Sequence, residues 1–220
     1  MSNKIMAIKH VKHWRVMKIE IRTSKSAATT RPRTKLRHKR EGKTKMEIQR
    51  VWAMPNSKTF TIKPIKQLIK DELIKGVVLD PFANDHSIKE VMTDEQRYIS
   101  NDLDTSFDTD YHLDALDFLK QFDDESVDMV LYDPPYSPRQ VSEVYKAMDR
   151  TVNMQTTQAS YWGNQKKEIA RILKPNGKVI TFGWNSGGIG KTRGFEIQKI
   201  LLVAHGGWHN DTICTVEIKK

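Results

Sequence analysis

Residues 127–136 read VDMVLYDPPY, and this stretch decides the fold. Its apolar run, from Met129 to Tyr132, is rich in β-formers and predicts a strand that is buried on both faces of a parallel sheet. Pro134 and Pro135 end the strand, because each lacks an N–H and fixes φ. Asp133 is therefore expected at the carboxyl end of a central strand, where open α/β sheets bind their ligands.

The residue types at this strand end suit methylation of an exocyclic amine on a nucleobase. Such an amine is a poor nucleophile, and acceptors for both of its hydrogens push the nitrogen towards tetrahedral geometry. The Asp133 carboxylate and the Pro134 carbonyl, which Pro135 holds rigid, could be those acceptors. Tyr136 could stack on a base extruded from its helix. The alternative is a strand followed by a rigid turn, against which Tyr136 merely packs.

The sequence Asp133-Pro134-Pro135-Tyr136 resembles motif IV of the S-adenosylmethionine-dependent amino-methyltransferases, which methylate adenine N6 or cytosine N4. The family's cytosine enzymes more often carry serine at the first position, so the aspartate favours adenine. The resemblance covers residues 52–219. It implies an α/β, Rossmann-like class I methyltransferase fold, with a mixed seven-stranded sheet and helices on both faces. Two β-like runs, at 195–204 and 212–218, are expected to close the sheet as a C-terminal antiparallel hairpin.

Two further segments resemble the family's cofactor motifs. Residues 60–65 (FTIKPI) resemble motif X and precede a helical pattern at 65–74, which implies that Thr61 and Pro64 contact the cofactor. Residues 77–82 (VVLDPF) resemble motif I, which implies the same for Asp80 and Phe82.

The motif I resemblance has one departure. The family's two spaced glycines are replaced within Ala83, Asn84 and Asp85, although Asn84 could adopt the left-handed conformation of a glycine. A short helix is expected after it, at 86–96.

Two more expected strands, at 97–100 and 111–115, are associated with acids. Asp102 matches the residue that binds ribose hydroxyls in dinucleotide-type folds. Asp114 matches motif III, which accepts from the adenine amine of the cofactor. One such acid is more typical of a helix N-cap, but three of them upstream of Asp133 indicate an S-adenosylmethionine site. Arg139 and Gln140 follow motif IV and are candidates for contact with the target, although a surface arginine that caps the loop is the alternative for Arg139.

The net charge of +10 is concentrated at the N-terminus. Residues 1–50 carry sixteen Lys and Arg against three Glu, a balance of +13, so the rest of the chain carries −3. We expect residues 1–45 to be a basic, flexible arm and residues 46–220 to be the catalytic domain. Such an arm favours DNA as partner, with RNA possible, because lysines and arginines bind phosphates without reading sequence. An organelle-targeting segment and a solubilising tail are the alternatives.

Other features narrow the class of protein. Cys214 is the single cysteine, which excludes an intrachain disulfide and favours a reducing compartment. No apolar stretch approaches the ~18 residues of a membrane helix. We expect a cytoplasmic enzyme of a bacterial or phage-infected cell, of phage or prophage type. The glycine-rich segment 187–192 (GGIGKT) does not have the spacing of a phosphate loop, and His205, His209 and Cys214 lack the further paired ligands of a metal site.

The interval between Asp114 and Asp133 leaves no room for a target-recognition insert. The sequence therefore predicts a DNA adenine-N6 methyltransferase that reads a short sequence or very little sequence. RNA adenine-N6 and DNA cytosine-N4 methylation keep the same chemistry. A catalytically silent nucleic-acid-binding protein is an alternative of another class. The oligomeric state is not readable from the sequence.

Overall fold

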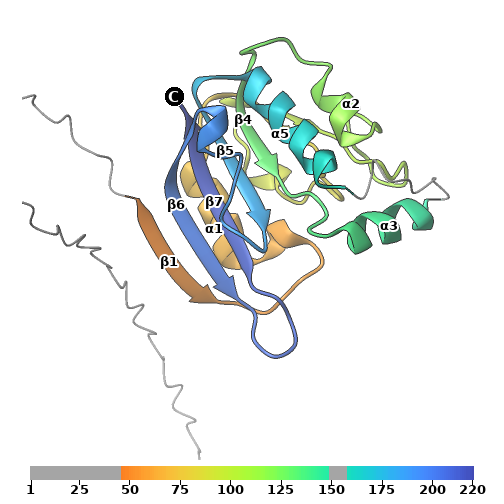
Figure 1. Ribbon diagram of the computed structural model, residues 1–220, viewed down its shortest axis with the longest axis vertical. Coiled ribbons are helices and arrows are strands. Elements are labelled where there is room, and N and C mark those ends of the chain that lie inside the picture. Colours follow the sequence, from red (N-terminus) through yellow and green to blue (C-terminus); the bar gives the residue numbers. More distant parts are fainter. Residues whose placement is uncertain (1–45, 149–157) are drawn as a thin grey trace, which may run out of the picture. The chain divides into compact units, whose positions relative to one another are not determined.

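Seven strands form one mixed sheet in the computed structural model, which describes residues 46–148 and 158–220 (Figure 1). The predicted arm at 1–45 lies outside the described residues. The sheet order is β1-β6-β7-β5-β4-β2-β3. The strands are β1 (Glu47–Trp52), β2 (Gly76–Asp80), β3 (Gln96–Ser100), β4 (Val127–Tyr132), β5 (Leu173–Gly183), β6 (Phe195–Ala204) and β7 (Thr212–Lys219).

The pairing is that of a doubly wound sheet closed by a hairpin. Strand β4 runs parallel to β2 and β5, and β2 runs parallel to β3, whereas β7 is antiparallel to both β5 and β6. The chain places β3 on one side of β2 and β4 on the other, so the sheet order switches direction between β2 and β4. Ligands of open α/β sheets bind at such a switch, beyond the carboxyl ends of the strands. The predicted α/β, Rossmann-like fold, with a mixed seven-stranded sheet and a C-terminal antiparallel hairpin, is confirmed.

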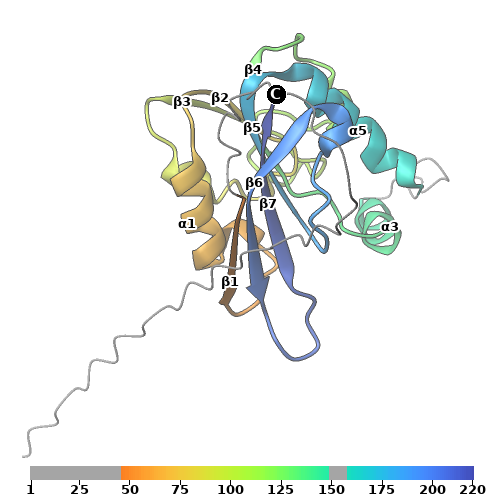
Figure 2. The same ribbon diagram turned by 60° about the vertical axis from the view of Figure 1, so that its left-hand side comes forward.

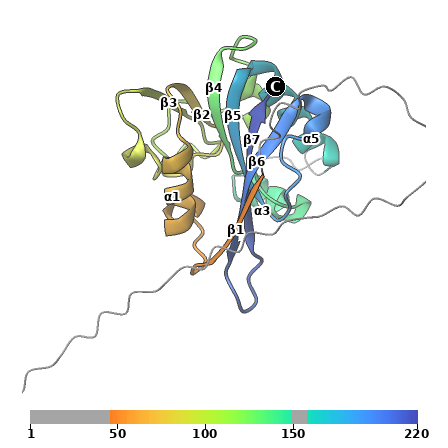
Figure 3. The ribbon, with the colours of Figure 1, turned by 90° about the vertical axis from the view of Figure 1, so that its left-hand side faces the viewer.

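Helices cover both faces of the sheet, as Figures 2 and 3 show for α1 and α5. The helices are α1 (Lys63–Glu72), α2 (Ala115–Leu119), α3 (Pro138–Ala147) and α5 (Ala159–Ile172), with short 3-10 turns η1 (Thr59–Thr61), η2 (Lys89–Val91) and η3 (Lys191–Arg193). Pro64 lies in the first turn of α1, where the N–H that proline lacks would have no helical partner. No described helix is long and apolar enough to span a membrane.

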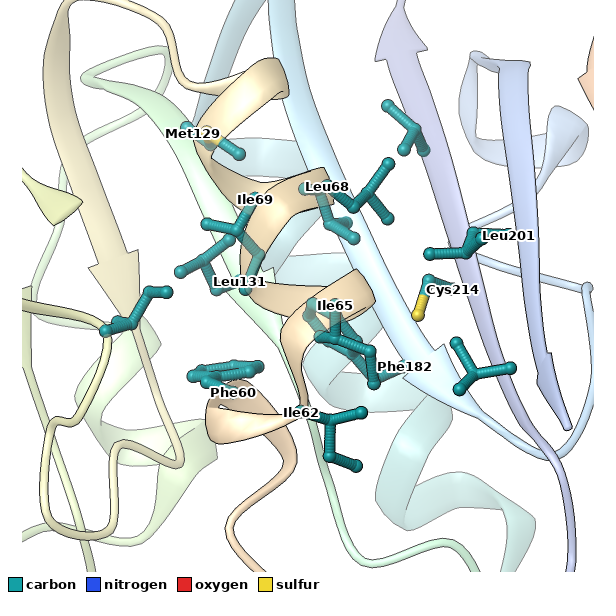
Figure 4. Packing of buried hydrophobic residues seen from close by; sticks show 14 of the residues in the cluster. Phe60, Ile62, Ile65, Leu68, Ile69, Met129, Leu131, Phe182, Leu201 and Cys214 are labelled. Atoms are coloured by element: carbon teal, nitrogen blue, oxygen red, sulfur yellow. The ribbon is translucent and has the colours of Figure 1, made fainter. Parts of the chain in front are cut away.

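Strand β4 is buried on both faces, as its apolar run predicts. Met129 and Leu131 point to the α1 side, where they pack with Ile65, Ile69 and other residues of one core cluster (Figure 4). Val130 and Tyr132 point to the other side, into a second cluster that includes residues of α2 and α5. The carboxyl end of β4 is thus fixed from both faces, and the residues that follow it are fixed with it.

One predicted strand is wrong. The segment at 111–115 forms a single bridge, between Tyr111 and Asn101, and Ala115 already belongs to α2. The physical reason is that side chains occupy the positions a strand would need: the Asp110 carboxylate accepts from the backbone N–H of Ser100 at 2.8 Å, and the Asn101 amide bonds both N–H and C=O of Leu113. The seventh strand is β1 instead, which adds parallel to β6 at the opposite edge.

Two loops also differ from simple expectation. The short helix expected at 86–96 is reduced to the single turn η2. The sequence Pro175-Asn176-Gly177, which is typical of a tight turn, lies inside β5 as a bulge: the pairing with β4 jumps from Leu173 to Lys178, and Asn176 takes a φ of +64°.

The glycine-rich segment after β5 is a connection, as expected, and it surrounds a carboxylate of the protein itself. Glu217 of β7 is fully buried and accepts from the backbone N–H of Ile189 at 2.6 Å and of Gly190 at 3.1 Å. Lys166 of α5 donates to the carbonyl of Gly188 at 2.6 Å. The N–H groups that resemble a phosphate cradle therefore already bind an internal anion.

Candidate active site

The loop at 133–136 is held by two helices. Trp162 of α5 donates its indole N–H to the Pro135 carbonyl at 2.8 Å. Gln140 of α3 accepts from the backbone N–H of Tyr136 at 2.6 Å. Within residues 46–148 and 158–220, the Pro134 carbonyl forms no such bond. The structure thus fixes both ends of the loop and leaves the Pro134 carbonyl available as an acceptor.

The Asp133 carboxylate has an internal partner. The Tyr136 hydroxyl donates to its Oδ1 at 2.5 Å. Burial raises the pKa of Asp133 to about 6, although bonds from the Tyr136 and Thr59 hydroxyls favour the ionised form. The Tyr136 ring also packs edge-on against Trp184, with ring centroids 5.6 Å apart. Asp133 is therefore ionised above about pH 6, as an acceptor for an amine must be.

A cavity of about 860 Å³ opens at the carboxyl ends of the parallel strands. Its walls come from the segment before η1, from the loops after β2, β3 and β4, and from the tip of the β6–β7 hairpin. It brings together eight of the residues predicted for the site: Phe82, Asp102, Asp114, Asp133, Pro134, Pro135, Tyr136 and Gln140. Residues separated by up to 58 positions in sequence thus share one concave surface, which is the usual form of a small-molecule site.

Asp102 and Asp114 line the cavity and also hold the backbone. Asp102 accepts from the backbone N–H of Asn84 and of Asp104, both at 2.9 Å, and burial raises its pKa. Asp114 caps α2 by accepting from Leu116 N–H at 3.0 Å, and its other oxygen accepts from the Tyr145 hydroxyl. The N-cap alternative for Asp114 is therefore realised. It is compatible with a binding role, since each carboxylate oxygen has a second lone pair.

Asp80 lies beneath the cavity and does not line it. Its side chain is fully buried and accepts from the Tyr98 hydroxyl at 2.8 Å and from the backbone N–H of Phe82 at 3.3 Å. Burial, together with a smaller effect of the nearby carboxylates of Asp133 and Asp102, raises the pKa of Asp80 to about 8. This position suits support of the loop that begins at Phe82, and not direct contact with a ligand.

The loop after β2 keeps a glycine-like backbone without glycine. Asn84 has a φ of +50°, as the sequence allowed, and His86 has a φ of +41°. The two left-handed positions are spaced by one residue, Asp85. Asn84 and His86 therefore take the backbone conformation that glycine adopts most readily. Backbone strain of this kind occurs at functional sites when the surroundings hold it in place.

Three predicted residues lie away from the cavity. The Thr61 hydroxyl donates to the Lys58 carbonyl at 2.7 Å, and Pro64 belongs to the first turn of α1. The Arg139 side chain is 87% exposed and pairs with Glu143 one helical turn further on, at 2.7 Å. This is the surface alternative noted for Arg139. Gln140 does line the cavity, but its oxygen is used on the backbone of Tyr136.

Sequence patterns missed several cavity residues. Lys58 and Asp85 form an ion pair, with Nζ and Oδ2 2.5 Å apart, and both line the cavity. Trp184 and the wholly exposed Trp208 stand at its wall. An exposed tryptophan at a hairpin tip is a signal available in the sequence only once the hairpin is assigned. The ion pair has no local signal, because its partners are 27 positions apart.

His205 is engaged in hydrogen bonds within the protein. Its Nδ1 lies 2.9 Å from the Ala53 carbonyl, and its Nε2 lies 2.9 Å from the Thr212 hydroxyl. Among the residues described, no group of three or more His, Cys, Asp or Glu is arranged to bind a metal. Cys214 is fully buried, and burial raises the pKa of its thiol.

The sequence matches no protein-family model, and no curated protein is significantly similar to it. Among solved structures, the chain is similar to TrmN from Thermus thermophilus, with 17% identity, a TM-score of 0.48 and coverage of 72% of this chain and 49% of that chain. It is also similar to 1,6-didemethyltoxoflavin-N1-methyltransferase from Burkholderia thailandensis, solved with S-adenosylhomocysteine, with 12% identity, a TM-score of 0.48 and coverage of 72% and 77%. The chain spans about half the length of TrmN, and likeness at this level concerns the fold alone.

Proposed function

We propose that the protein transfers a methyl group from S-adenosylmethionine to the N6 amine of adenine in DNA, with little or short sequence specificity. The observation that carries the proposal is the end of β4. There Asp133, a carboxylate with a pKa of about 6, and Pro134 line the same cavity as Asp102 and Asp114.

The donor set of the cavity fits S-adenosylmethionine. Asp102 would accept from the ribose hydroxyls, and the second lone pairs of Asp114 would accept from the adenine amine. Leu113 and Phe107 supply apolar wall on the same side. When bound, this cofactor supplies a methyl carbon whose bonding electrons stay with sulfur, while the amine nitrogen forms the new bond and gives up one proton.

The target side of the cavity is built for an amine on a flat ring. Asp133 and the Pro134 carbonyl would each accept one hydrogen of the amine, which directs the nitrogen lone pair outwards. The Oδ1 atom of Asp133 keeps its bond from Tyr136, and each carboxylate oxygen has a second lone pair that the amine could use. Tyr136 and Trp184 provide aromatic surface beside these acceptors, as expected for a base taken out of its stack.

The test is methyl transfer with identification of the product. The protein is incubated with methyl-labelled cofactor and either unmethylated DNA or RNA of matched sequence, and the nucleosides are then separated. We expect label in N6-methyldeoxyadenosine. Label in RNA or in N4-methylcytosine would replace the proposed target, and nucleic-acid binding without any transfer would support the catalytically silent alternative.

Asp133→Ala is the variant that tests the assigned site. Loss of an interaction made mainly in the transition state should lower turnover by about 10²–10³ and leave cofactor affinity nearly unchanged. Arg139→Ala, which alters an exposed side chain near the same loop, is the matched control and should retain turnover. Near-normal turnover in Asp133→Ala would show that the loop is only a rigid turn.

A further inference from the structure

The ion pair between Lys58 and Asp85 crosses from one wall of the cavity to another. Lys58 precedes η1, and Asp85 lies in the loop after β2. The backbone of Lys58 is fixed on both sides, because its N–H donates to the Asn56 side chain at 2.9 Å and its carbonyl accepts from Thr61 at 2.7 Å. The side chains are 49% and 30% exposed, so solvent and ligands can reach both charges.

The loop that carries Asp85 is held in an unusual conformation. Asp85 lies between the two residues with positive φ, Asn84 and His86. For residues with a Cβ this conformation is unfavourable. Asp102 holds one side of the loop through the N–H of Asn84 at 2.9 Å. The result is a carboxylate that points towards Lys58 at the place where a glycine-rich loop would present only backbone.

A pair of this exposure contributes little to stability, since solvent screens exposed ion pairs. Burial alone would raise the pKa of Asp85, but its bond to Lys58 outweighs burial and the pKa is lowered, so the Asp85 carboxylate is ionised at neutral pH. The cavity therefore presents one fixed positive and one fixed negative charge side by side. That charge pattern complements a zwitterion, in which a carboxylate and an ammonium group are carried on one carbon.

We propose that Lys58 and Asp85 bind the amino-acid end of the cofactor, Lys58 the α-carboxylate and Asp85 the α-ammonium group. This inference rests on the proposed function. In the ligand complex each charge would exchange its protein partner for a ligand partner, so no charge is left uncompensated. The side chains of the pair would thus bind the end of the cofactor that, in the resembling family, the backbone at the spaced glycines approaches.

The test compares two ligands that differ only in this end. S-adenosylhomocysteine carries the amino acid, and 5′-methylthioadenosine has the same nucleoside and sulfur without it. Calorimetry on the full chain should show tighter binding of S-adenosylhomocysteine. Lys58→Met and Asp85→Asn should each weaken its binding by about tenfold, the effect of losing one charge-assisted hydrogen bond, and should change binding of methylthioadenosine by less than about threefold.

Two further variants separate ligand binding from structure. Lys75→Met breaks an ion pair of the same length outside the cavity, in which Lys75 Nζ lies 2.5 Å from Glu95 Oε1. This variant should change the affinity for neither ligand. The exchange Lys58→Asp with Asp85→Lys restores an ion pair but reverses the charges. It should keep the thermal melting temperature and still bind S-adenosylhomocysteine weakly, whereas a purely structural pair would be rescued.

The outcomes distinguish this inference from the proposed function. If the wild-type protein binds neither ligand at millimolar concentration, the cofactor assignment itself fails. If both ligands bind equally well, or if the variants weaken both to the same extent, Lys58 and Asp85 do not bind the amino-acid end. The cofactor assignment would stand in that case.

Discussion

At the scale of single residues, the proposed role of Asp133 as acceptor for the amine requires an ionised carboxylate, and its burial disfavours that charge. Burial raises its pKa from 3.8 to about 6, and the Tyr136 hydroxyl limits the rise. Because the amine needs the ionised carboxylate, turnover should be lost as pH falls through about 6 and should be level above about 7. The pH profile of activity should therefore have an acid limb whose position is determined by the pKa of Asp133.

Tyr136→Phe tests this coupling. The variant keeps the ring for stacking, so turnover at pH 8 should change by less than about threefold. It removes the bond that favours ionised Asp133, so the acid limb of the kcat profile should move to higher pH. Tyr145→Phe removes a comparable hydroxyl bond, to Asp114, and should leave the limb in place. An unmoved limb in Tyr136→Phe would show that the hydroxyl does not hold Asp133 during turnover.

At the scale of elements, the connection after β5 depends on one glycine packed against a buried charge. A Cβ added to Gly188 would lie 2.1 Å from the Glu217 carboxylate, at a φ of +53°. Gly188→Ala should therefore lower the free energy of unfolding by about 2 kcal/mol or more, from strain and from disturbed hydrogen bonds to Glu217.

Gly163→Ala is the matched control for that prediction. Gly163 lies within α5, and nothing lies within 4 Å of the position its Cβ would take. Replacing a helical glycine with alanine should raise the free energy of unfolding by about 0.5–1 kcal/mol. Urea denaturation of the two variants should thus give changes of opposite sign, and a stable Gly188→Ala would contradict the packing around Glu217.

The β6–β7 hairpin is the second element with a testable role. Its tip joins strands whose ends lie at the same edge as the carboxyl ends of β4 and β5 (Figure 1). Trp208 in this tip lines the cavity and is wholly exposed. Aromatic side chains at such a wall suit stacking with bases.

Trp208→Ala should weaken binding of single-stranded DNA by about 1–3 kcal/mol, the usual value of one base–aromatic stack. Fluorescence anisotropy would measure it. Trp52→Ala alters a tryptophan that is 59% exposed and does not line the cavity, and should have little effect. Equal losses in the two variants would show a general loss of apolar surface, and not a stacking contact.

At the scale of the whole molecule, positive charge is concentrated near the N-terminus and the rest of the chain is net negative. Residues 1–45 carry fifteen Lys and Arg, whereas the balance of residues 51–220 is −3. The net negative charge of residues 51–220 opposes binding to DNA. The proposed binding therefore requires that the basic residues of segment 1–45 contribute most of the phosphate contacts.

Deleting residues 1–45 should weaken DNA binding and leave turnover intact at saturating DNA. If about six of the basic residues contact phosphates, the slope of log affinity against log salt should fall by about 5. Binding titrations at several salt concentrations measure the slope, with turnover of the same sample as the control for folding. An unchanged slope would exclude the arm as the phosphate contact.

The sequence by itself determined where several strands of the sheet end. Periodicity and proline placed β4, α1 and the hairpin, because apolar alternation and a missing N–H act locally and leave few other structures. It also predicted that Asp102 and Asp133 would share one surface, since the carboxyl ends of parallel strands meet at one edge of a sheet.

Only the tertiary structure decided which segments completed the sheet and which side chains face the cavity. The strand expected at 111–115 lost its backbone partners to Asp110 and Asn101, and β1 took the free edge beside β6. Asp80 lies beneath the cavity, and Lys58 forms an ion pair with Asp85 across it. These outcomes depend on contacts between residues far apart in the chain, and no local pattern records such contacts.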